Sequence, residues 1–433
     1  MKNHLPFLTL MFSFIMIMCC CYVTLQQHTL NNSFISSPPS IESLNLHFSS
    51  FSGRLPHSIS NLMFLSNLDL SGCAFSGTIP STLFIMPSLQ FLGLRENQFT
   101  GPLTIPSSLK NLSCLSSLDL DELYISNNNI RGEINPLFCN INSLIVLNLS
   151  NNNFNGEILP CLDSISSLQW LKLSNNKFEG SIPLSLGNLT QLSYLDLSKY
   201  RLSGRIPQLG NNSMFNTLSN LGVLDVSNNQ LTGSIPQCLG SFSQHLQVLN
   251  MNENNFSGEM PQIFADGSKL ITLDLSHNQL EGMVPQFIGD LQSLIVLNLS
   301  SNNFECHIPR SVENMIQLES LDLSNNKLSG RIPQELGNLT LLAYLNLSNN
   351  QLTGMIPQGT QMSTFSKSLF NGNVELCGLP LSECEDSNDE MPSTTLDHVS
   401  KFWSGFGWKA VAIGYACSFL GGVLGGYLFI SKK

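Results

Sequence analysis

Residues 318–357 read LESLDLSNNKLSGRIPQELGNLTLLAYLNLSNNQLTGMIP, which is one pattern written twice in succession. The pattern is Leu-x-x-Leu-x-Leu-x-x-Asn-x-Leu-x-Gly-x-Ile-Pro, and equivalent leucines recur every 24 residues, as at Leu299, Leu323 and Leu347. Working outward from this stretch, we find thirteen copies between Ile41 and Pro357, with three irregular joints of 31, 29 and 25 residues. One copy of this size cannot bury its apolar face by itself, so the copies must stack.

Each part of the pattern predicts one part of a coil. Leu-x-Leu predicts a short strand with its leucines inward and its x residues outward. The glycine allows a turn conformation that other residues resist, and Ile-Pro predicts a 3₁₀ or extended return on the convex side. The predicted fold class is a leucine-rich-repeat solenoid over residues 41–357, a right-handed superhelix with a parallel β-sheet on its concave face.

An asparagine three residues beyond each strand is expected to bond backbone groups of the adjoining turns. Ser49, Cys73 and Tyr200 replace it in repeats 1, 2 and 7, which we expect to be locally looser. The other ten repeats keep it, at Asn97, Asn128, Asn152, Asn176, Asn229, Asn254, Asn278, Asn302, Asn326 and Asn350.

Two further irregularities are interpreted as structural variations without a functional role. Cys306 occupies the glycine position of repeat 11, which we interpret as tolerated drift and not, with His307 alone beside it, as a metal site. The tract DLDELYI, residues 119–125, we interpret as a solvated insertion between repeats 3 and 4 and not as an acid/base pair.

Composition limits the function classes. A net charge of −11, with 11% charged residues, gives no excess of positive charge for binding nucleic acid. The eight histidines are scattered and no Gly-x-Ser-x-Gly or nucleotide-binding loop occurs, so we expect no enzyme, no cofactor and no metal.

The two ends carry apolar runs. Residues 1–24 have the form of a secretory signal peptide, with a signal anchor as the alternative, and residues 25–40 form a short N-terminal segment. Residues 409–430 predict one transmembrane helix, with Trp403 and Trp408 at its outer interface and Lys432 and Lys433 inside. The expected topology is single-pass type I in the plasma membrane. Only residues 431–433 remain for the cytoplasmic tail, so signalling would need a partner.

The expected membrane span contains small residues four apart, which permit close helix approach. They are Gly414, Ser418, Gly421, Gly422, Gly425 and Gly426, and the alternative is ordinary glycine tolerance in membranes. Between repeats and membrane we expect a C-terminal cap, residues 358–384, closed by a Cys377–Cys384 disulfide. An acidic linker, residues 385–408, is either a solvated spacer or pairs with a basic segment of a partner. We propose that Cys139 and Cys161 also pair, because they lie about one stacking step apart; the sequence leaves this open.

Export makes the N-glycosylation sequons meaningful. Nine occur, at Asn31, Asn111, Asn148, Asn188, Asn211, Asn255, Asn298, Asn338 and Asn346. Asn148, Asn298 and Asn346 fall at outward strand positions, so glycans there would cover part of the concave face.

Large aromatic and charged residues gather at outward strand or strand-end positions of repeats 3 to 7. They are Phe91, Arg95, Glu96, Tyr124, Trp170, Lys172, Tyr194 and Lys199. Aromatic residues and arginine dominate binding hot spots, so we predict a ligand-binding site here. The alternative is that lone exposed aromatics carry no meaning.

From residue 318 to 384, and in the acidic linker, glycine-rich span and short tail that follow, the chain resembles the plant leucine-rich-repeat receptor-like proteins, which lack a kinase domain. The resemblance implies a plasma-membrane receptor, in pathogen defence, whose solenoid binds a peptide, protein or glycan. It also implies a leucine-rich-repeat receptor kinase as partner, bound through the span and the linker.

Two departures from that family leave alternatives open. The tryptophan- and cysteine-containing N-terminal cap is missing, and no island interrupts the last repeats. A truncated decoy or non-functional paralogue is therefore one alternative. A wall-associated, enzyme-inhibitor-like binding protein similar to the polygalacturonase-inhibiting proteins is the other.

Overall fold

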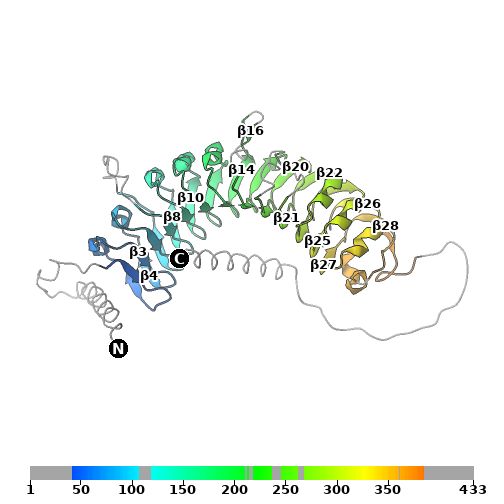
Figure 1. Ribbon diagram of the computed structural model, residues 1–433, viewed down its shortest axis with the longest axis horizontal. Helices are drawn as coiled ribbons and strands as arrows, with labels where there is room; N and C mark the ends of the chain where they lie inside the picture. Colours follow the sequence, from blue (N-terminus) through cyan, green and yellow to red (C-terminus); the bar gives the residue numbers. More distant parts are fainter. Residues whose placement is uncertain are drawn as a thin grey trace, which may run out of the picture.

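The structure is a computed structural model that describes residues 41–106, 119–209, 212–213, 218–236, 245–261, 268–359 and 361–384. These residues form one curved coil (Figure 1) whose successive turns are stacked side by side. The expected signal peptide, N-terminal segment, acidic linker, membrane span and tail lie outside the described residues. Among the residues that are described, no helix has the length and apolar character needed to cross a membrane.

The leucine-rich core of each repeat forms one strand of a thirteen-stranded parallel sheet. The register is regular, as where Trp170, Leu171 and Lys172 pair with Tyr194, Leu195 and Asp196. The central leucine of each strand is buried, as the pattern requires. The strands, in order, are β1 (Ser43–Asn45), β3 (Asn67–Asp69), β5 (Phe91–Gly93), β7 (Glu122–Tyr124), β9 (Val146–Asn148), β11 (Trp170–Lys172), β13 (Tyr194–Asp196), β17 (Val223–Asp225), β19 (Val248–Asn250), β21 (Thr272–Asp274), β23 (Val296–Asn298), β25 (Ser320–Asp322) and β27 (Tyr344–Asn346).

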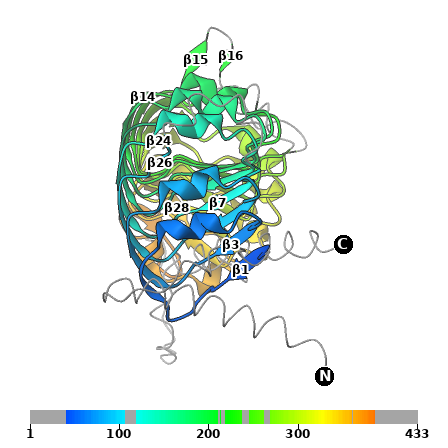
Figure 2. The same ribbon diagram turned by 90° about the vertical axis from the view of Figure 1, so that its left-hand side faces the viewer.

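The residues after each ladder position form a second parallel sheet, of fourteen strands, which is not among the predicted elements. The end-on view in Figure 2 shows this sheet, with β24, β26 and β28, on a different side of the coil from β1 and β3. Its strands are β2 (Ser52–Arg54), β4 (Ala74–Gly77), β6 (Gln98–Gly101), β8 (Asn129–Gly132), β10 (Asn153–Glu157), β12 (Lys177–Gly180), β14 (Arg201–Arg205), β18 (Gln230–Gly233), β20 (Asn255–Glu259), β22 (Gln279–Met283), β24 (Asn303–Cys306), β26 (Lys327–Arg331), β28 (Gln351–Met355) and β29 (Glu375–Cys377). A short antiparallel pair, β15 (Gln208–Leu209) and β16 (Asn212–Ser213), takes up part of the 29-residue joint.

The convex return contains short 3₁₀ helices, as the Ile-Pro element predicts. Most begin directly after the proline, whereas η6 and η7 include it in the first turn, which its fixed φ suits. The five-residue helices are η2 (His57–Asn61), η3 (Ser81–Ile85), η6 (Pro136–Asn140), η7 (Pro160–Ser164), η8 (Leu184–Asn188), η11 (Gln286–Asp290), η12 (Arg310–Asn314) and η13 (Gln334–Asn338). Two shorter ones, η14 (Met362–Thr364) and η15 (Lys367–Leu369), lie in the C-terminal cap.

The asparagine ladder bonds the repeats to one another. The Nδ2 of Asn152 donates to the carbonyl oxygens of Ile125, Leu149 and Ser150 at 3.0–3.2 Å, and its Oδ1 accepts from the amide of Ile130 at 3.1 Å. Each asparagine thus bonds to four backbone groups that would otherwise be unpaired, and two of them belong to the preceding repeat. The cap continues the ladder through Asn373, which the 24-residue count did not single out.

The substituted ladder positions are filled in two different ways. The thiol of Cys73 donates to the carbonyl of Leu46 at 3.2 Å, the contact that an asparagine makes elsewhere, and lies 3.4 Å from the Ser49 hydroxyl. Tyr200 is buried and packs edge-on against Phe178, with ring centroids 5.4 Å apart, but its hydroxyl has no partner among the described groups. Repeat 2 therefore keeps part of the ladder, whereas repeat 7 replaces it with aromatic packing.

The tract at residues 119–125 is not an insertion. Leu120 is fully buried, and Glu122 begins strand β7 of the concave sheet. The extra residues of the long joint precede this tract, so its acidic groups belong to repeat 4. The prediction failed because the irregular spacing hid the repeat boundary.

Candidate ligand-binding face

The outward residues of the concave strands form two parallel rows. One row runs through Phe91, Glu122, Val146, Trp170 and Tyr194, and ends at Tyr344. The other contains Tyr124, Asn148, Lys172, Asp196 and Asp225, and continues with alternating Asn and Asp. Since strands in a sheet lie about 4.8 Å apart, groups on adjacent repeats contact each other directly.

Trp170 and Tyr194 form a stacked pair on β11 and β13. Their ring centroids are 4.8 Å apart with 9° between the planes. Lys172 lies beside the pair, with its Nζ 5.9 Å from the Tyr194 centroid and 3.3 Å from the Asp196 carboxylate. Burial, and then the carboxylates of Asp196 and Asp225, raise the pKa of Tyr194 well above its ordinary value. The phenol therefore stays protonated, and the cluster combines apolar rings with fixed charges.

A second aromatic pair lies in repeats 3 and 4. Phe91 and Tyr124 are tilted at 42° with centroids 5.6 Å apart, and the Tyr124 hydroxyl donates to Oε2 of Glu122 at 3.1 Å. Burial is the main cause that raises the pKa of Glu122. Repeat 5 separates this pair from the first one with the smaller Val146 and Asn148. The predicted patch is thus two aromatic pairs and not one continuous surface.

The structure places the remaining predicted residues at the edge of the face. Glu96 and Lys199 are exposed and share the left-handed position after the strand, with φ of 56° and 61°. Arg95 is half-buried next to Glu96. Tyr194 was expected to be exposed but is only 8% exposed, because its neighbours in the row cover it. Glu122, which we expected in an insertion, contributes to the face instead.

A row of carboxylates continues from the aromatic cluster. Burial, and then the neighbouring Asp196 carboxylate, raise the pKa of Asp225 to about 6. Burial also raises the pKa of Asp274, which accepts hydrogen bonds from Ser276 and Asn252. The alternation of Asp and Asn that follows in this row makes the face acidic from repeat 7 onward.

Three predicted glycan acceptors lie on this face, and they differ in access. Asn298 is 5% exposed, and its Oδ1 accepts from the Ser300 amide and hydroxyl at 3.1 and 2.8 Å. Asn148 and Asn346 are half-buried and make the same serine contacts. Asn188, Asn255 and Asn338 are exposed, and Asn31, Asn111 and Asn211 lie outside the described residues. Burial at Asn298 contradicts the expectation of an accessible outward side chain.

The cysteines divide into two pairs and two free thiols within the described part of the chain. Disulfides join Cys139 to Cys161 and Cys377 to Cys384, while Cys73 and Cys306 are unpaired. In the described ranges no group of three metal-ligating side chains occurs. The small residues proposed for helix association, Gly414 to Gly426, lie outside those ranges.

The family comparison matches the repeats along the chain. The description "Leucine Rich Repeat" matches residues 40–62, 64–85, 119–141, 143–165, 167–189 and 220–242, and a second description, "Leucine rich repeat", matches 244–304 and 307–352. Together these matches cover more than half of the 433 residues.

Curated relatives that match the chain are plant receptor-like proteins. The chain is 36% identical over 84 residues to Receptor-like protein 32 of Arabidopsis thaliana, covering 19% of this chain and 9% of that protein. It is 34% identical over 116 residues to Receptor-like protein EIX2 of Solanum lycopersicum, covering 27% of this chain and 10% of that protein. The matched stretches therefore span about a tenth of the length of these relatives.

Several solved structures share the coil. The PEPR1–AtPEP1 crystal structure aligns with a TM-score of 0.68 at 32% identity, covering 79% of this chain and 45% of that one. The structure of the Arabidopsis receptor kinase HAESA, in complex with the peptide hormone IDA and the co-receptor SERK1, aligns with a TM-score of 0.55 at 30% identity. The alignment covers 77% of this chain and 62% of that one. A plant ice-binding protein aligns with a TM-score of 0.56 at 32% identity, covering 61% of this chain and 84% of that one. The chain belongs to the leucine-rich-repeat family, and its matched stretches are similar to plant receptor-like proteins.

Proposed function

We propose that the chain is a receptor-like protein of the plasma membrane that binds an extracellular peptide, protein or glycan on the concave face of repeats 3 to 7. The observation that carries this proposal is the Trp170–Tyr194 stack beside the Lys172–Asp196 ion pair. Large rings and a fixed charge on one curved sheet supply the anchors that dominate binding energy. The residues of the proposed site are Phe91, Arg95, Glu96, Glu122, Tyr124, Trp170, Lys172, Tyr194 and Lys199.

The similar proteins support a ligand-binding role. Two of the similar structures are named for complexes, one of PEPR1 with AtPEP1 and one of HAESA with a peptide hormone and a co-receptor. The relatives are named receptor-like proteins. By analogy, a peptide is the first class of ligand to test.

The site is tested with two aromatic substitutions in the same row. Full-length protein is screened against a synthetic peptide library and a glycan array, and probes bound by the wild type are measured again. Trp170→Ala should weaken binding at least about tenfold, the effect of losing an aromatic anchor. Tyr344→Ala is the matched control, because Tyr344 occupies the same row in repeat 13. If Tyr344→Ala weakens binding as much as Trp170→Ala does, the site lies elsewhere.

Signalling is proposed to run through an associated leucine-rich-repeat receptor kinase, in defence. The small-residue stripe of residues 414–426 is the proposed contact within the membrane, since close backbone approach drives helix association in lipid. Replacing Gly422 and Gly426 with Leu should reduce co-purification of the kinase without changing the amount of protein at the cell surface. A surface-expressed wild type that captures no kinase would support the decoy alternative.

A further inference from the structure

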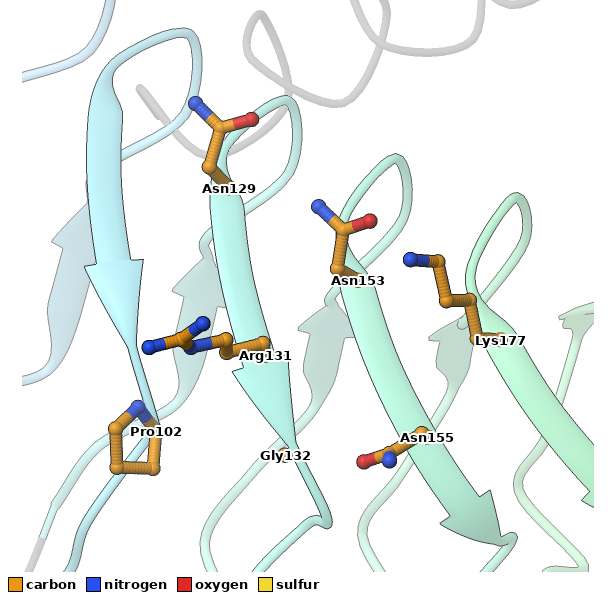
Figure 3. A pocket seen from close by; sticks show the side chains of 7 residues that line it. All are labelled: Pro102, Asn129, Arg131, Gly132, Asn153, Asn155 and Lys177. Atoms are coloured by element: carbon orange, nitrogen blue, oxygen red, sulfur yellow. The ribbon is translucent and has the colours of Figure 1, made fainter.

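A polar groove lies on the second sheet, on a different face of the repeats from the aromatic pairs. It has a volume of about 670 Å³ and crosses β8, β10 and β12. Figure 3 shows the side chains that line it. Its side chains are Asn129 and Arg131 from β8, Asn153 and Asn155 from β10, and Lys177 from β12. We call this the amide groove. Pro102 and Gly132 complete the lining, so the groove combines groups for hydrogen bonding and charge with the ring of Pro102.

The register places the two cations on either side of the amides. Arg131 pairs with Asn153, and Asn155 pairs with Lys177. A ligand that crosses the groove therefore meets a guanidinium, two amides and an ammonium across three strands. Those strands span about 10 Å, given a spacing of about 4.8 Å between neighbours.

The two cations of the groove form no ion pair within the described part of the chain. In the described part of the chain, ion pairs join Lys172 to Asp196, His47 to Asp69 and Arg310 to Glu335, and neither Arg131 nor Lys177 takes part in one. None of the three groove asparagines begins an Asn-x-Ser/Thr sequon, so no N-glycan is expected to cover them. The carboxylates of the same strands, Glu157 and Glu179, lie outside the lining.

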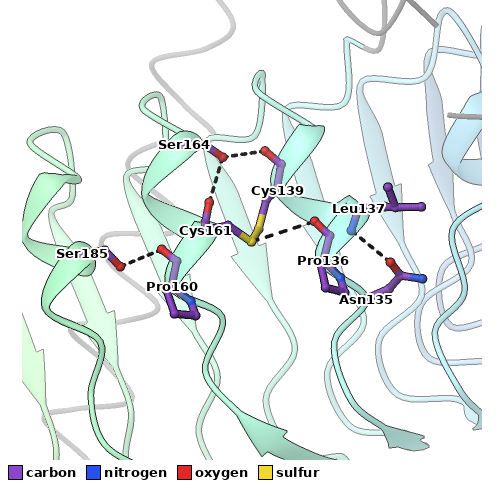
Figure 4. Close-up of a disulfide and its surroundings, with 8 residues drawn as sticks. All are labelled: Asn135, Pro136, Leu137, Cys139, Pro160, Cys161, Ser164 and Ser185. Carbon is purple, nitrogen blue, oxygen red and sulfur yellow. Dashed lines mark hydrogen bonds between the residues drawn. A yellow bond between two sulfur atoms is a disulfide. The ribbon is translucent and has the colours of Figure 1, made fainter. Parts of the chain in front are cut away.

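A disulfide joins two of the three repeats that supply the strands of the groove. Cys139 in η6 and Cys161 in η7 belong to the repeats that supply β8 and β10. Figure 4 shows the Ser164 hydroxyl beside it, donating to the carbonyls of Cys139 and Cys161 at 2.7 and 2.8 Å. A binding surface held in advance loses less entropy when a ligand binds.

The lining favours an acidic oligosaccharide over an acidic peptide. Amides both donate and accept, which matches sugar hydroxyls, and a guanidinium and an ammonium match carboxylates. Peptides instead depend on apolar anchors or on a free sheet edge, whereas β10 is already paired on both sides, with β8 and β12. The net charge of −11 opposes general binding of polyanions, so recognition must come from local contacts.

We propose that the amide groove binds an oligosaccharide that contains uronic acids, with Arg131 and Lys177 each pairing with a carboxylate. This binding does not depend on the ligand of the concave face. The same repeats would thus hold a protein or peptide ligand on one face and an acidic glycan on another.

The test measures binding of oligogalacturonate to full-length protein by biolayer interferometry. Arg131→Gln with Lys177→Gln should weaken binding by about a hundredfold, about tenfold for each charged contact. The matched control is Lys327→Gln with Arg331→Gln on β26 of the same sheet, which removes the same two positive charges and should change binding less than about twofold. Replacing Arg131 with Lys instead of Gln should keep part of the affinity, because the positive charge remains. Binding of oligogalacturonate to the wild type should weaken as the salt concentration is raised.

Several outcomes would overturn the proposal. One is a wild type that does not bind oligogalacturonate at low salt, and another is an equal loss in the two double variants. A wild type that binds poly-glutamate but not oligogalacturonate would show that the groove takes acidic peptides. Trp170→Ala, which tests the concave face, should leave oligogalacturonate binding unchanged, so failure of one site is distinguishable from failure of the other.

Discussion

Trp170 covers Tyr194: the two rings lie 4.8 Å apart and nearly parallel, and Tyr194 is 8% exposed as a result of this and its other neighbours. Residues 24 apart in the chain thereby become one aromatic surface. The stack leaves Trp170 as the accessible ring and Tyr194 as its support.

The stack should be measurable as a coupling free energy. Trp170→Ala, Tyr194→Ala and the double variant form a cycle, and we expect a coupling of about 1 kcal/mol from chemical denaturation, as for other aromatic pairs. A cycle on Trp170 and Tyr344, which lie in the same row but far apart, should give no coupling. Additive effects in the first cycle would show that the two rings act separately.

The ladder predicts a large cost for removing one asparagine. Asn302→Ala removes donors to the carbonyls of Leu275, Leu299 and Ser300 and the acceptor of the Leu280 amide. We expect a loss of about 3 kcal/mol, since buried backbone groups are left unpaired. Hydrogen exchange should rise first in repeats 10 and 11. Protection unchanged in those repeats would mean that water replaces the side chain.

The opposite result is expected at Tyr200, whose buried hydroxyl has no partner among the described groups. Tyr200→Phe keeps the ring against Phe178 and removes an unpaired polar group. The free energy of unfolding should stay the same or rise by about 1 kcal/mol. A marked fall in the denaturation midpoint would show that the hydroxyl makes a bond that matters.

Cys306 occupies a glycine position with φ of +64°, where a side chain is strained. Cys306→Gly should therefore stabilise the protein by about 1 kcal/mol, and it should remove a thiol without loss of a disulfide. Gly204→Ala is the reverse test, because its φ is +79° and the nearest atom to the new methyl group lies 4.0 Å away. Gly204→Ala should lower the free energy of unfolding by about 1 kcal/mol. An unchanged free energy would show that these turns adjust to a side chain without strain.

Both disulfides should be found linked when the non-reduced protein is digested and its peptides are identified by mass spectrometry. Replacing Cys139 and Cys161 with Ser should cost about 3 kcal/mol, given a separation of 22 residues. Replacing Cys377 and Cys384 with Ser should lower the free energy of unfolding by less, because this disulfide closes a separation of only 7 residues. The reverse ranking would contradict a mechanism based on chain entropy.

Stability should fall as pH rises between about 4 and 6. The pKa of Asp225 is raised from 3.8 to about 6 in the folded protein, so the folded state binds the proton more tightly than the unfolded state. Its contribution is complete below the unfolded pKa and is lost as pH rises through the folded one. Asp225→Asn should be more stable than the wild type at pH 7 and lose this advantage at pH 4, as measured by urea denaturation at both values. Asn148 shows that an amide makes the same serine contacts in this row.

The sequence by itself determined the solenoid, the concave sheet, the 3₁₀ returns and the role of the ladder asparagines. These depend on contacts within one repeat or between identical positions of neighbours, so a period of 24 residues is enough to specify them. The tertiary structure decided what depends on the irregular joints and on lateral packing. It placed Glu122 on the concave face, buried Tyr194 and Asn298, and split the predicted patch at Val146. It also formed the second sheet that aligns Arg131, Asn155 and Lys177, because side-chain pairing across a stack is set by register and by the size of the neighbour, which a repeat pattern does not specify.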